Sequence, residues 1–218
     1  MKIKLVIFDL DGVLVDAREL HYCALNQALE TIDYKFIINR KEHLSTFDGL
    51  STTKKLQMLT DKKGLPEGVH DLVWKLKQEK TIQIIDKFSI DYRIQSLLAK
   101  LKKDGYIIAC ATNSIRETAK LQLIRKGFME HIDFLFANTD VTKPKPHPEI
   151  YMQCMLKAGV SPKETIIIED SHHGRKAASE SGGYLCAVKN CEDLTSDKVY
   201  EYLKKINKKD TFKPKWQG

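Results

Sequence analysis

The sequence has no apolar run that approaches the roughly 20 residues of a membrane-spanning helix. It also lacks the apolar segment and small-residue cleavage site of a secretory signal, because a strand-like pattern already starts at Ile3. These absences predict a cytoplasmic protein that has no membrane partner.

Cysteine is present but follows no ligand or disulfide pattern. The five cysteines are scattered, odd in number and contain no C-x-x-C pair. Without such pairs a disulfide framework is excluded and a structural zinc site is not expected.

The sequence also lacks any known nucleic-acid motif and any basic stripe interleaved with aromatic residues. Lysine and arginine number 36 against 29 aspartates and glutamates, which gives a formal net charge of +7. We interpret this excess as a lysine-rich solvated surface, with attraction of anionic ligands as the alternative, and we expect no nucleic-acid partner.

Short apolar strand patterns alternate with helical patterns over most of the 218 residues. The predicted strands cover residues 3–8, 107–111, 134–137, 165–168 and 184–188. The predicted helices between them cover residues 92–103, 115–126, 148–157 and 174–181. Such alternation indicates an α/β fold, a Rossmann-like parallel sheet with helices on both faces.

One region interrupts this alternation. Between residues 16 and 88 the sequence has helical patterns over 19–31, 52–62 and 69–79, and no convincing core strand. We interpret an all-helical block between the first two strands as a small inserted α-helical cap. The predicted domains are therefore a core of residues 1–15 and 89–218 and a cap of residues 16–88.

Two aspartates follow the first strand pattern at positions i and i+2. The apolar run of residues 6–8 leads directly into Asp9 and Asp11, and Gly12 comes next. Because residues two apart in an extended backbone point to the same side, both carboxylates face one spot at the end of a buried strand. Two negative charges at such a short distance need a cation or a proton between them. The pair predicts a metal site, an acid–base role, or both.

Three later segments place further polar residues at strand ends. Thr112 and Asn113 follow the second strand, where a hydroxyl and helix N-terminal amides can bind an anion. A lysine held among the prolines of residues 143–148 is a fixed cation that can compensate carboxylates and a phosphate. Glu169 and Asp170 follow the fourth strand, and hard oxygen ligands at two strand ends suit octahedral Mg²⁺.

Together and in this order, the four segments resemble the motifs of the haloacid dehalogenase superfamily of phosphotransferases. The subgroup that the chain resembles includes β-phosphoglucomutase and phosphoglycolate phosphatase. The run Asp9-Leu10-Asp11-Gly12-Val13 is close to diagnostic, and the resemblance covers nearly the whole chain, including the helical insert. It implies the fold of that superfamily, with Mg²⁺ as the cofactor.

The resemblance also implies a role for each matching residue. Asp9 would be the nucleophile that forms an aspartyl-phosphate, and Asp11 would be the acid/base, with its backbone carbonyl on Mg²⁺. The other motif residues would bind the phosphoryl group (Thr112, the Asn113 amide and a lysine) or the metal (Asp9 with Asp170, and Glu169 directly or through water). The family pattern Lys-Pro-x-Pro-acid-apolar-aromatic matches throughout from Lys145 to Tyr151, whereas Lys143 begins only half of it. We therefore assign this lysine to Lys145.

Substrate contacts in the cap are implied in the same way. His21 matches a cap histidine near the hinge, and residues 47–52, with Gly49, Ser51 and Thr52, match a loop that sets specificity. In the mutases of the subgroup an arginine that grips a second phosphate follows this serine, and Thr52 stands there instead. Losing that bidentate fork favours a phosphatase over a mutase.

We therefore expect an Mg²⁺-dependent phosphomonoesterase that hydrolyses a small phosphorylated metabolite, such as a sugar or polyol phosphate, through an aspartyl-phosphate. A sugar phosphomutase is the first alternative, and a non-catalytic module that binds anions or nucleic acid is the second. A monomer is expected, because one cap can close one site by itself.

Overall fold

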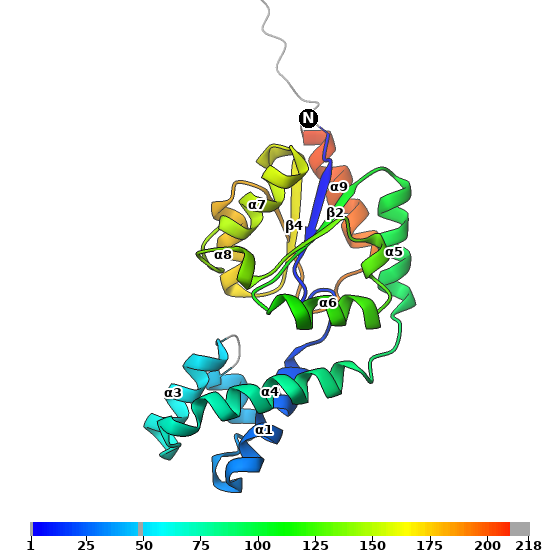
Figure 1. Ribbon diagram of the computed structural model, residues 1–218. Helices are drawn as coiled ribbons and strands as arrows, with labels where there is room; N and C mark the ends of the chain where they lie inside the picture. The colour runs from blue at the N-terminus through cyan, green and yellow to red at the C-terminus, as the bar shows by residue number, and fades with distance from the viewer. Residues whose placement is uncertain (1, 48–49, 210–218) are drawn as a thin grey trace, which may run out of the picture. The chain divides into compact units, whose positions relative to one another are not determined.

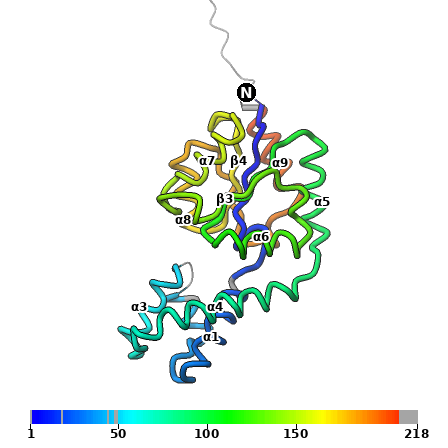
Figure 2. The backbone as a smooth tube through the Cα atoms, in the orientation of Figure 1, coloured from blue at the N-terminus to red at the C-terminus, as the bar shows by residue number. Residues whose placement is uncertain are grey.

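The computed structural model describes residues 2–47 and 50–209 of the chain. The chain forms two compact units: a core unit of Met1–Asp16 and Ser89–Gly218, and a helical unit of Ala17–Phe88. Figure 2 shows the chain leaving the core unit after its first strand and re-entering it before α5. That the two units are a core domain and a cap domain stays a prediction.

The core unit is built on a five-stranded sheet in which all neighbouring strands are parallel. Its order is β3-β2-β1-β4-β5. The strands are β1 (Leu5–Phe8), β2 (Ile107–Ala111), β3 (Phe134–Phe136), β4 (Thr165–Glu169) and β5 (Tyr184–Ala187). Central β1 pairs with β2 and β4, and Leu5 aligns with both Ile107 and Thr165. This register brings the carboxyl ends of the three central strands to one edge.

Helices cover both faces of this sheet, as the sequence predicts for an α/β fold. The long helices of the core unit are α5 (Tyr92–Lys103), α6 (Arg116–Arg125), α7 (Glu149–Ala158), α8 (His172–Glu180) and α9 (Ser196–Lys209). Short helical turns are η4 (Met129–His131), η5 (Asn138–Asp140) and η6 (Pro162–Glu164). Helices α7 and α8 lie on one side of the sheet and α5 and α9 on the other (Figure 1).

All four residues of β1 are buried, and the alternation of side chains along the strand places Leu5 and Ile7 on one face of the sheet. Leu5 and Ile7 pack with Tyr151 and Met155 of α7 in one buried cluster. Helix α5 forms because its apolar residues recur at three- and four-residue spacing and because the Asp91 side chain accepts hydrogen bonds from the first-turn amides. The predicted fold class is confirmed.

The helical unit has its own buried core. Its elements are α1 (Arg18–Ile32), η1 (Tyr34–Phe36), α2 (Arg40–Glu42), η2 (His43–Phe47), α3 (Thr52–Lys63), η3 (Glu67–Val69) and α4 (His70–Ile85). Leu25, Leu29, Leu59 and Val73 pack together in its centre. Of the residues that the structure describes in both units, none lies in a helix long and apolar enough to span a membrane.

Candidate active site

The first aspartate is a continuation of β1. Asp9 follows the alternation of Leu5 and Ile7, and its backbone N–H donates to the Ile168 carbonyl oxygen at 3.0 Å. The pairing of β1 with β4 therefore extends to the first residue after the strand. The Asp9 side chain is only 8% exposed, so its carboxylate needs a partner inside the protein.

A glycine turn follows directly. Gly12 has a φ of +91°, a region that L side chains rarely adopt, and its N–H donates to the Val15 carbonyl oxygen at 2.7 Å. A Cβ at this position would lie 2.2 Å from Oδ2 of Asp170. The carboxylate at the end of β4 therefore lies against the backbone of the β1 loop, in space that only glycine leaves open.

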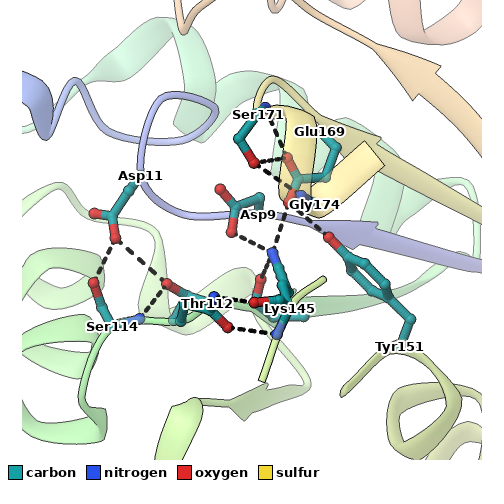
Figure 3. A network of polar contacts seen from close by, with 11 residues as sticks. Asp9, Asp11, Thr112, Ser114, Lys145, Tyr151, Glu169, Ser171 and Gly174 are labelled. Carbon is teal, nitrogen blue, oxygen red and sulfur yellow. Dashed lines mark hydrogen bonds and ion pairs between the residues drawn. The ribbon is translucent and has the colours of Figure 1, made fainter. Parts of the chain in front are cut away.

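Lys145 joins the ends of the three central strands (Figure 3). Its Nζ donates to Oδ1 of Asp9 at 2.6 Å, to Oε1 of Glu169 at 2.7 Å and to the Ala111 carbonyl oxygen at 2.8 Å. An ammonium group has three donors, so these acceptors use all of them. Lys143, in contrast, is exposed.

The charges around Lys145 are strongly coupled. Burial disfavours the charged lysine, but the carboxylates of Asp9 and Glu169 outweigh this effect and hold the pKa of Lys145 well above its usual value. Burial and the neighbouring Glu169 raise the pKa of Asp9. Burial likewise opposes ionisation of Glu169, yet Lys145 and its hydrogen bond lower the pKa of that carboxyl. Lys145 and Glu169 are thus a charged pair, and a second cation bound beside Asp9 would favour the ionised form of that carboxyl.

Glu169 is the most completely enclosed acid of the site. Its side chain has 0% exposure. Oε1 accepts from Lys145 Nζ and from the Tyr151 hydroxyl at 2.8 Å, and Oε2 accepts from the backbone N–H and hydroxyl of Ser171 at 3.0 and 3.1 Å. A Cβ on Gly174 would lie 1.7 Å from Oε1, so α8 approaches this carboxylate as closely as it does because residue 174 is glycine.

The acids fit a divalent cation. Asp9, Glu169 and Asp170 each place a carboxylate oxygen within 4.8 Å of the others. With Asp11, four carboxyl groups share this edge with one lysine, and hard oxygen donors are what Mg²⁺ prefers. Since each oxygen of Glu169 already accepts two hydrogen bonds, Asp9 and Asp170 offer the carboxylates best suited to direct ligation.

The segment after β2 approaches Asp11. The Thr112 backbone N–H donates to the Phe136 carbonyl oxygen at 3.0 Å, which ties the segment to β3. The Thr112 hydroxyl accepts from the Ser114 N–H at 3.0 Å and donates to Oδ2 of Asp11 at 3.5 Å. The Ser114 hydroxyl donates to the same Asp11 oxygen. Two hydroxyl groups from the segment after β2 therefore donate to the carboxylate of Asp11, which follows β1.

Asn113 holds the backbone of the lysine. Its Oδ1 accepts from the Lys145 N–H at 3.0 Å, and its Nδ2 donates to the Lys145 carbonyl oxygen at 3.1 Å. The backbone donor and acceptor define the orientation of the amide without ambiguity. Lys145 is thus fixed at both ends, by Asn113 at its backbone and by two acids at its ammonium group.

The structure brings the predicted residues of the core unit to one edge of the sheet. They are Asp9, Asp11, Thr112, Asn113, Lys145, Glu169 and Asp170. The predicted cap residues belong to the helical unit: His21 is half-buried in α1, Ser51 caps α3 by accepting from the Lys54 N–H, and Thr52 is the first residue of α3. Gly49 lies outside the described residues. The roles of all these residues stay predictions.

Sequence reasoning missed four residues that touch the site. Tyr151 was recognised only as the aromatic end of the lysine pattern, although its hydroxyl is bonded to Glu169. Ser114, Ser171 and Gly174 carried no signal of their own, because serine and glycine at helix starts are common for reasons unrelated to chemistry. The only available hint was their position beside predicted site residues.

Comparison with known proteins agrees with this geometry. Residues 6–188 match the family model described as haloacid dehalogenase-like hydrolase. The pyrophosphatase PpaX of Bacillus velezensis is 25% identical over 220 residues, which cover 94% of each chain. Among solved structures, β-phosphoglucomutase from Clostridium difficile has a TM-score of 0.78 and 22% identity, covering 97% of this chain and 100% of the other. CbbY from Rhodobacter sphaeroides, in complex with phosphate, has a TM-score of 0.74 and 22% identity, covering 85% of each chain.

The chain belongs to the haloacid dehalogenase-like hydrolase family. The resemblance found in the sequence is confirmed, and so is the expectation of an enzyme of this family. The two solved structures, at 22% identity, show the fold.

Proposed function

We propose that the protein is an Mg²⁺-dependent phosphomonoesterase that hydrolyses a small phosphorylated metabolite through an aspartyl-phosphate on Asp9. The observation that carries the proposal is the buried lysine that links the ends of the three central strands, with its ammonium 2.6 Å from Asp9. Such a cation beside a nucleophilic carboxylate offsets the charge that a phosphoryl group brings. The family match and the relative named as a pyrophosphatase support the reaction class.

The chemical steps follow from the positions of the two aspartates. An oxygen of Asp9 attacks phosphorus, so an O–P bond to Asp9 forms while the bond from phosphorus to the leaving oxygen breaks. Asp11 gives its proton to that oxygen. Water then attacks the phosphoryl group, Asp11 takes a proton from it, and the O–P bond to Asp9 breaks to release phosphate.

The neighbouring residues of the core unit have supporting roles in these steps. Lys145 stabilises the negative phosphoryl oxygens, and the Thr112 hydroxyl with the Asn113 backbone N–H binds them at the end of β2. Mg²⁺, when bound by Asp9, Asp170 and the backbone carbonyl of Asp11, supplies further charge neutralisation. Glu169 holds Lys145 in place and would contact a bound ion only through water, because its own oxygens already accept four hydrogen bonds.

The substrate class is the finer part of the proposal. A sugar or polyol phosphate fits a site with one lysine and one set of phosphate-binding groups, and Thr52 offers no bidentate fork for a second phosphate. Release of phosphate from a panel of metabolites, with pyrophosphate included because of the relative's name, identifies the class. EDTA should abolish release, and added Mg²⁺ should restore it.

The decisive variant is Asp9→Asn, which keeps the size of the side chain and removes the nucleophilic carboxylate. We expect turnover of p-nitrophenyl phosphate to fall to background, while the exposed Asp197→Asn control retains wild-type activity. Rapid acid quenching of the wild type during turnover should reveal one phosphoryl group on the peptide that contains Asp9. Undiminished activity of pure Asp9→Asn protein would refute the proposal.

The same protein preparations distinguish the proposed phosphatase from two alternative functions. A sugar phosphomutase would convert β-glucose 1-phosphate to its isomer in the presence of a bisphosphate primer, whereas the proposed phosphatase releases inorganic phosphate. A non-catalytic module would bind anions or nucleic acid in a salt-dependent manner with no turnover of any substrate.

A further inference from the structure

The hydroxyl of Ser114 has an unusual partner for a serine at the start of a helix. Ser51 and Ser171 use their side chains as helix caps, accepting from the backbone N–H groups of Lys54 and Gly174. Helix α6 begins instead after Ile115, an N-cap residue that has no side-chain acceptor. The Ser114 hydroxyl donates across 103 residues of sequence to Asp11. The Ser114 hydroxyl therefore contacts the carboxylate of Asp11 and does not cap helix α6.

Several hydrogen bonds make this contact a fixed one. The Ser114 carbonyl oxygen accepts from the Asn138 N–H at 3.2 Å, and the Ser114 N–H donates to the Thr112 hydroxyl at 3.0 Å. Thr112 is in turn tied through its backbone N–H to Phe136 of β3. The backbone of Ser114 is thus held independently of its side chain, so that removing the hydroxyl changes one group and not the loop.

Both hydroxyl groups of this segment donate to the same oxygen of Asp11. Ser114 and Thr112 each direct a proton at Oδ2 (Figure 3). The Thr112 hydroxyl has one proton, which it would direct at a bound phosphoryl group during the reaction, so the bond from Ser114 is the one that stays on Oδ2. An oxygen that accepts this bond is a poor place for the acid's own proton, which then resides on the other oxygen. A general acid works only when its proton points at the leaving atom, so the choice between its two oxygens affects catalysis.

We propose that Ser114 is a positioning residue that fixes Oδ2 of Asp11 as the acceptor and places the transferable proton on Oδ1. This inference rests on the proposed function and deepens it. As phosphorus moves to Asp9 and its bond to the leaving oxygen breaks, that proton passes from Oδ1 to the leaving oxygen. Ser114 takes no proton and touches no reacting atom.

Leaving groups of different basicity test this role. p-Nitrophenolate departs without protonation, whereas an alkoxide from glycerol 2-phosphate or a sugar phosphate requires the acid. The parameter kcat/KM reports only the steps up to departure of the first leaving group. The later use of Asp11 as a base therefore does not affect it. In Ser114→Ala we expect kcat/KM to fall about 10- to 100-fold for the alkyl phosphate, part of the usual general-acid contribution, and less than about threefold for p-nitrophenyl phosphate.

Matched variants complete the experiment. Ser114→Thr keeps the hydroxyl and should restore the alkyl activity, and Ser114→Cys, a weak donor, should fall between serine and alanine. Ser96→Ala, which removes an exposed hydroxyl on α5, should match the wild type on both substrates. In an Asp11→Asn background, Ser114→Ala should cause no further loss, because the two groups act as a unit.

The possible outcomes separate the inference from the proposed function. Equal losses on the two substrates in Ser114→Ala, or no loss on either, would overturn the positioning role while leaving the phosphatase intact. If the wild type turns over neither substrate nor any member of the phosphate panel, the proposed function itself fails, and the role of Ser114 fails with it. Melting temperatures of all variants show whether each protein is folded.

Discussion

Gly174 provides a sharp test of the packing around Glu169. Replacing glycine by alanine within a helix is ordinarily stabilising by about 1 kcal/mol. In α8 the added Cβ would lie 1.7 Å from Oε1, 1.9 Å from Cδ and 2.3 Å from Oε2 of Glu169. Such overlap is impossible, so either the carboxylate or the helix must move.

The cost of that movement can be estimated from the contacts. Displacing the carboxylate removes the acceptor of the Lys145 ammonium and of the Tyr151 hydroxyl, both of which are buried. A buried donor left without an acceptor costs about 1–3 kcal/mol. After subtraction of the helix-propensity gain of about 1 kcal/mol, the loss of both acceptors should lower the free energy of unfolding of Gly174→Ala by about 1–5 kcal/mol. Activity should fall as well, since Glu169 helps to order Lys145.

Urea denaturation monitored by circular dichroism measures the stability, and phosphate release measures the activity. Gly68→Ala is the matched control, because no atom lies within 4 Å of a Cβ built there, and its stability should stay within about 0.5 kcal/mol of wild type. In a Glu169→Ala background the crowded carboxylate is absent, so Gly174→Ala should then cost nothing. A Gly174→Ala protein with wild-type stability and activity would show that this reasoning about the carboxylate is wrong.

Two further predictions concern other parts of the core unit. Asn113→Ala removes both hydrogen bonds to the Lys145 backbone and should lower kcat/KM about 10- to 100-fold with the fold intact, whereas an unchanged kcat/KM would show that the lysine is positioned without Asn113. Hydrogen bonds from Lys4 and from Ser161 lower the pKa of Glu164 to about 2, so its stabilising effect is present at neutral pH and is lost as the pH falls from about 4.5 towards 2. Urea midpoints of Glu164→Gln and wild type should therefore differ at about pH 6, and the difference should shrink below about pH 4.5 and vanish as the pH falls to about 2; a constant difference would contradict this assignment.

The arrangement of the core residues was predictable because of a general property of parallel sheets. Apolar runs that end in polar residues identified the strands, and the carboxyl ends of parallel strands share an edge. Asp9, Thr112 and Glu169 could therefore be expected near one another from the sequence alone. The structure places them at the carboxyl ends of β1, β2 and β4, the three central strands of the sheet.

Individual hydrogen-bond partners were beyond sequence reasoning. Ser114 and Ser171 both stand between a strand end and a helix, yet one bonds to Asp11 and the other caps α8 while contacting Glu169. The difference arises from which loop lies opposite each serine, and that depends on the order of the strands. No local pattern contains this information.

In the helical unit, the end of a helix could not be predicted from local sequence preference. Helix α4 continues to Ile85, six residues beyond the predicted end at residue 79. β-Branched residues near this end have low helix propensity, but Thr81 donates its hydroxyl to the Lys77 carbonyl oxygen at 2.7 Å, and both Thr81 and Ile85 are buried. Tertiary burial outweighed the local preference there.

The neighbouring acids Glu169 and Asp170 illustrate how backbone geometry divides a motif into separate tasks. Successive residues at the end of a strand point to opposite sides. Glu169 follows the alternation of Ile167, which packs against α7, and so meets Tyr151 of that helix and the lysine that precedes it. Asp170 points elsewhere and lies against Gly12 of the β1 loop. The sequence suggests these two adjacent carboxylates as a metal-binding pair, but they are not equivalent. Glu169 is hydrogen-bonded to Lys145, whereas Asp170 faces the loop that carries Asp11.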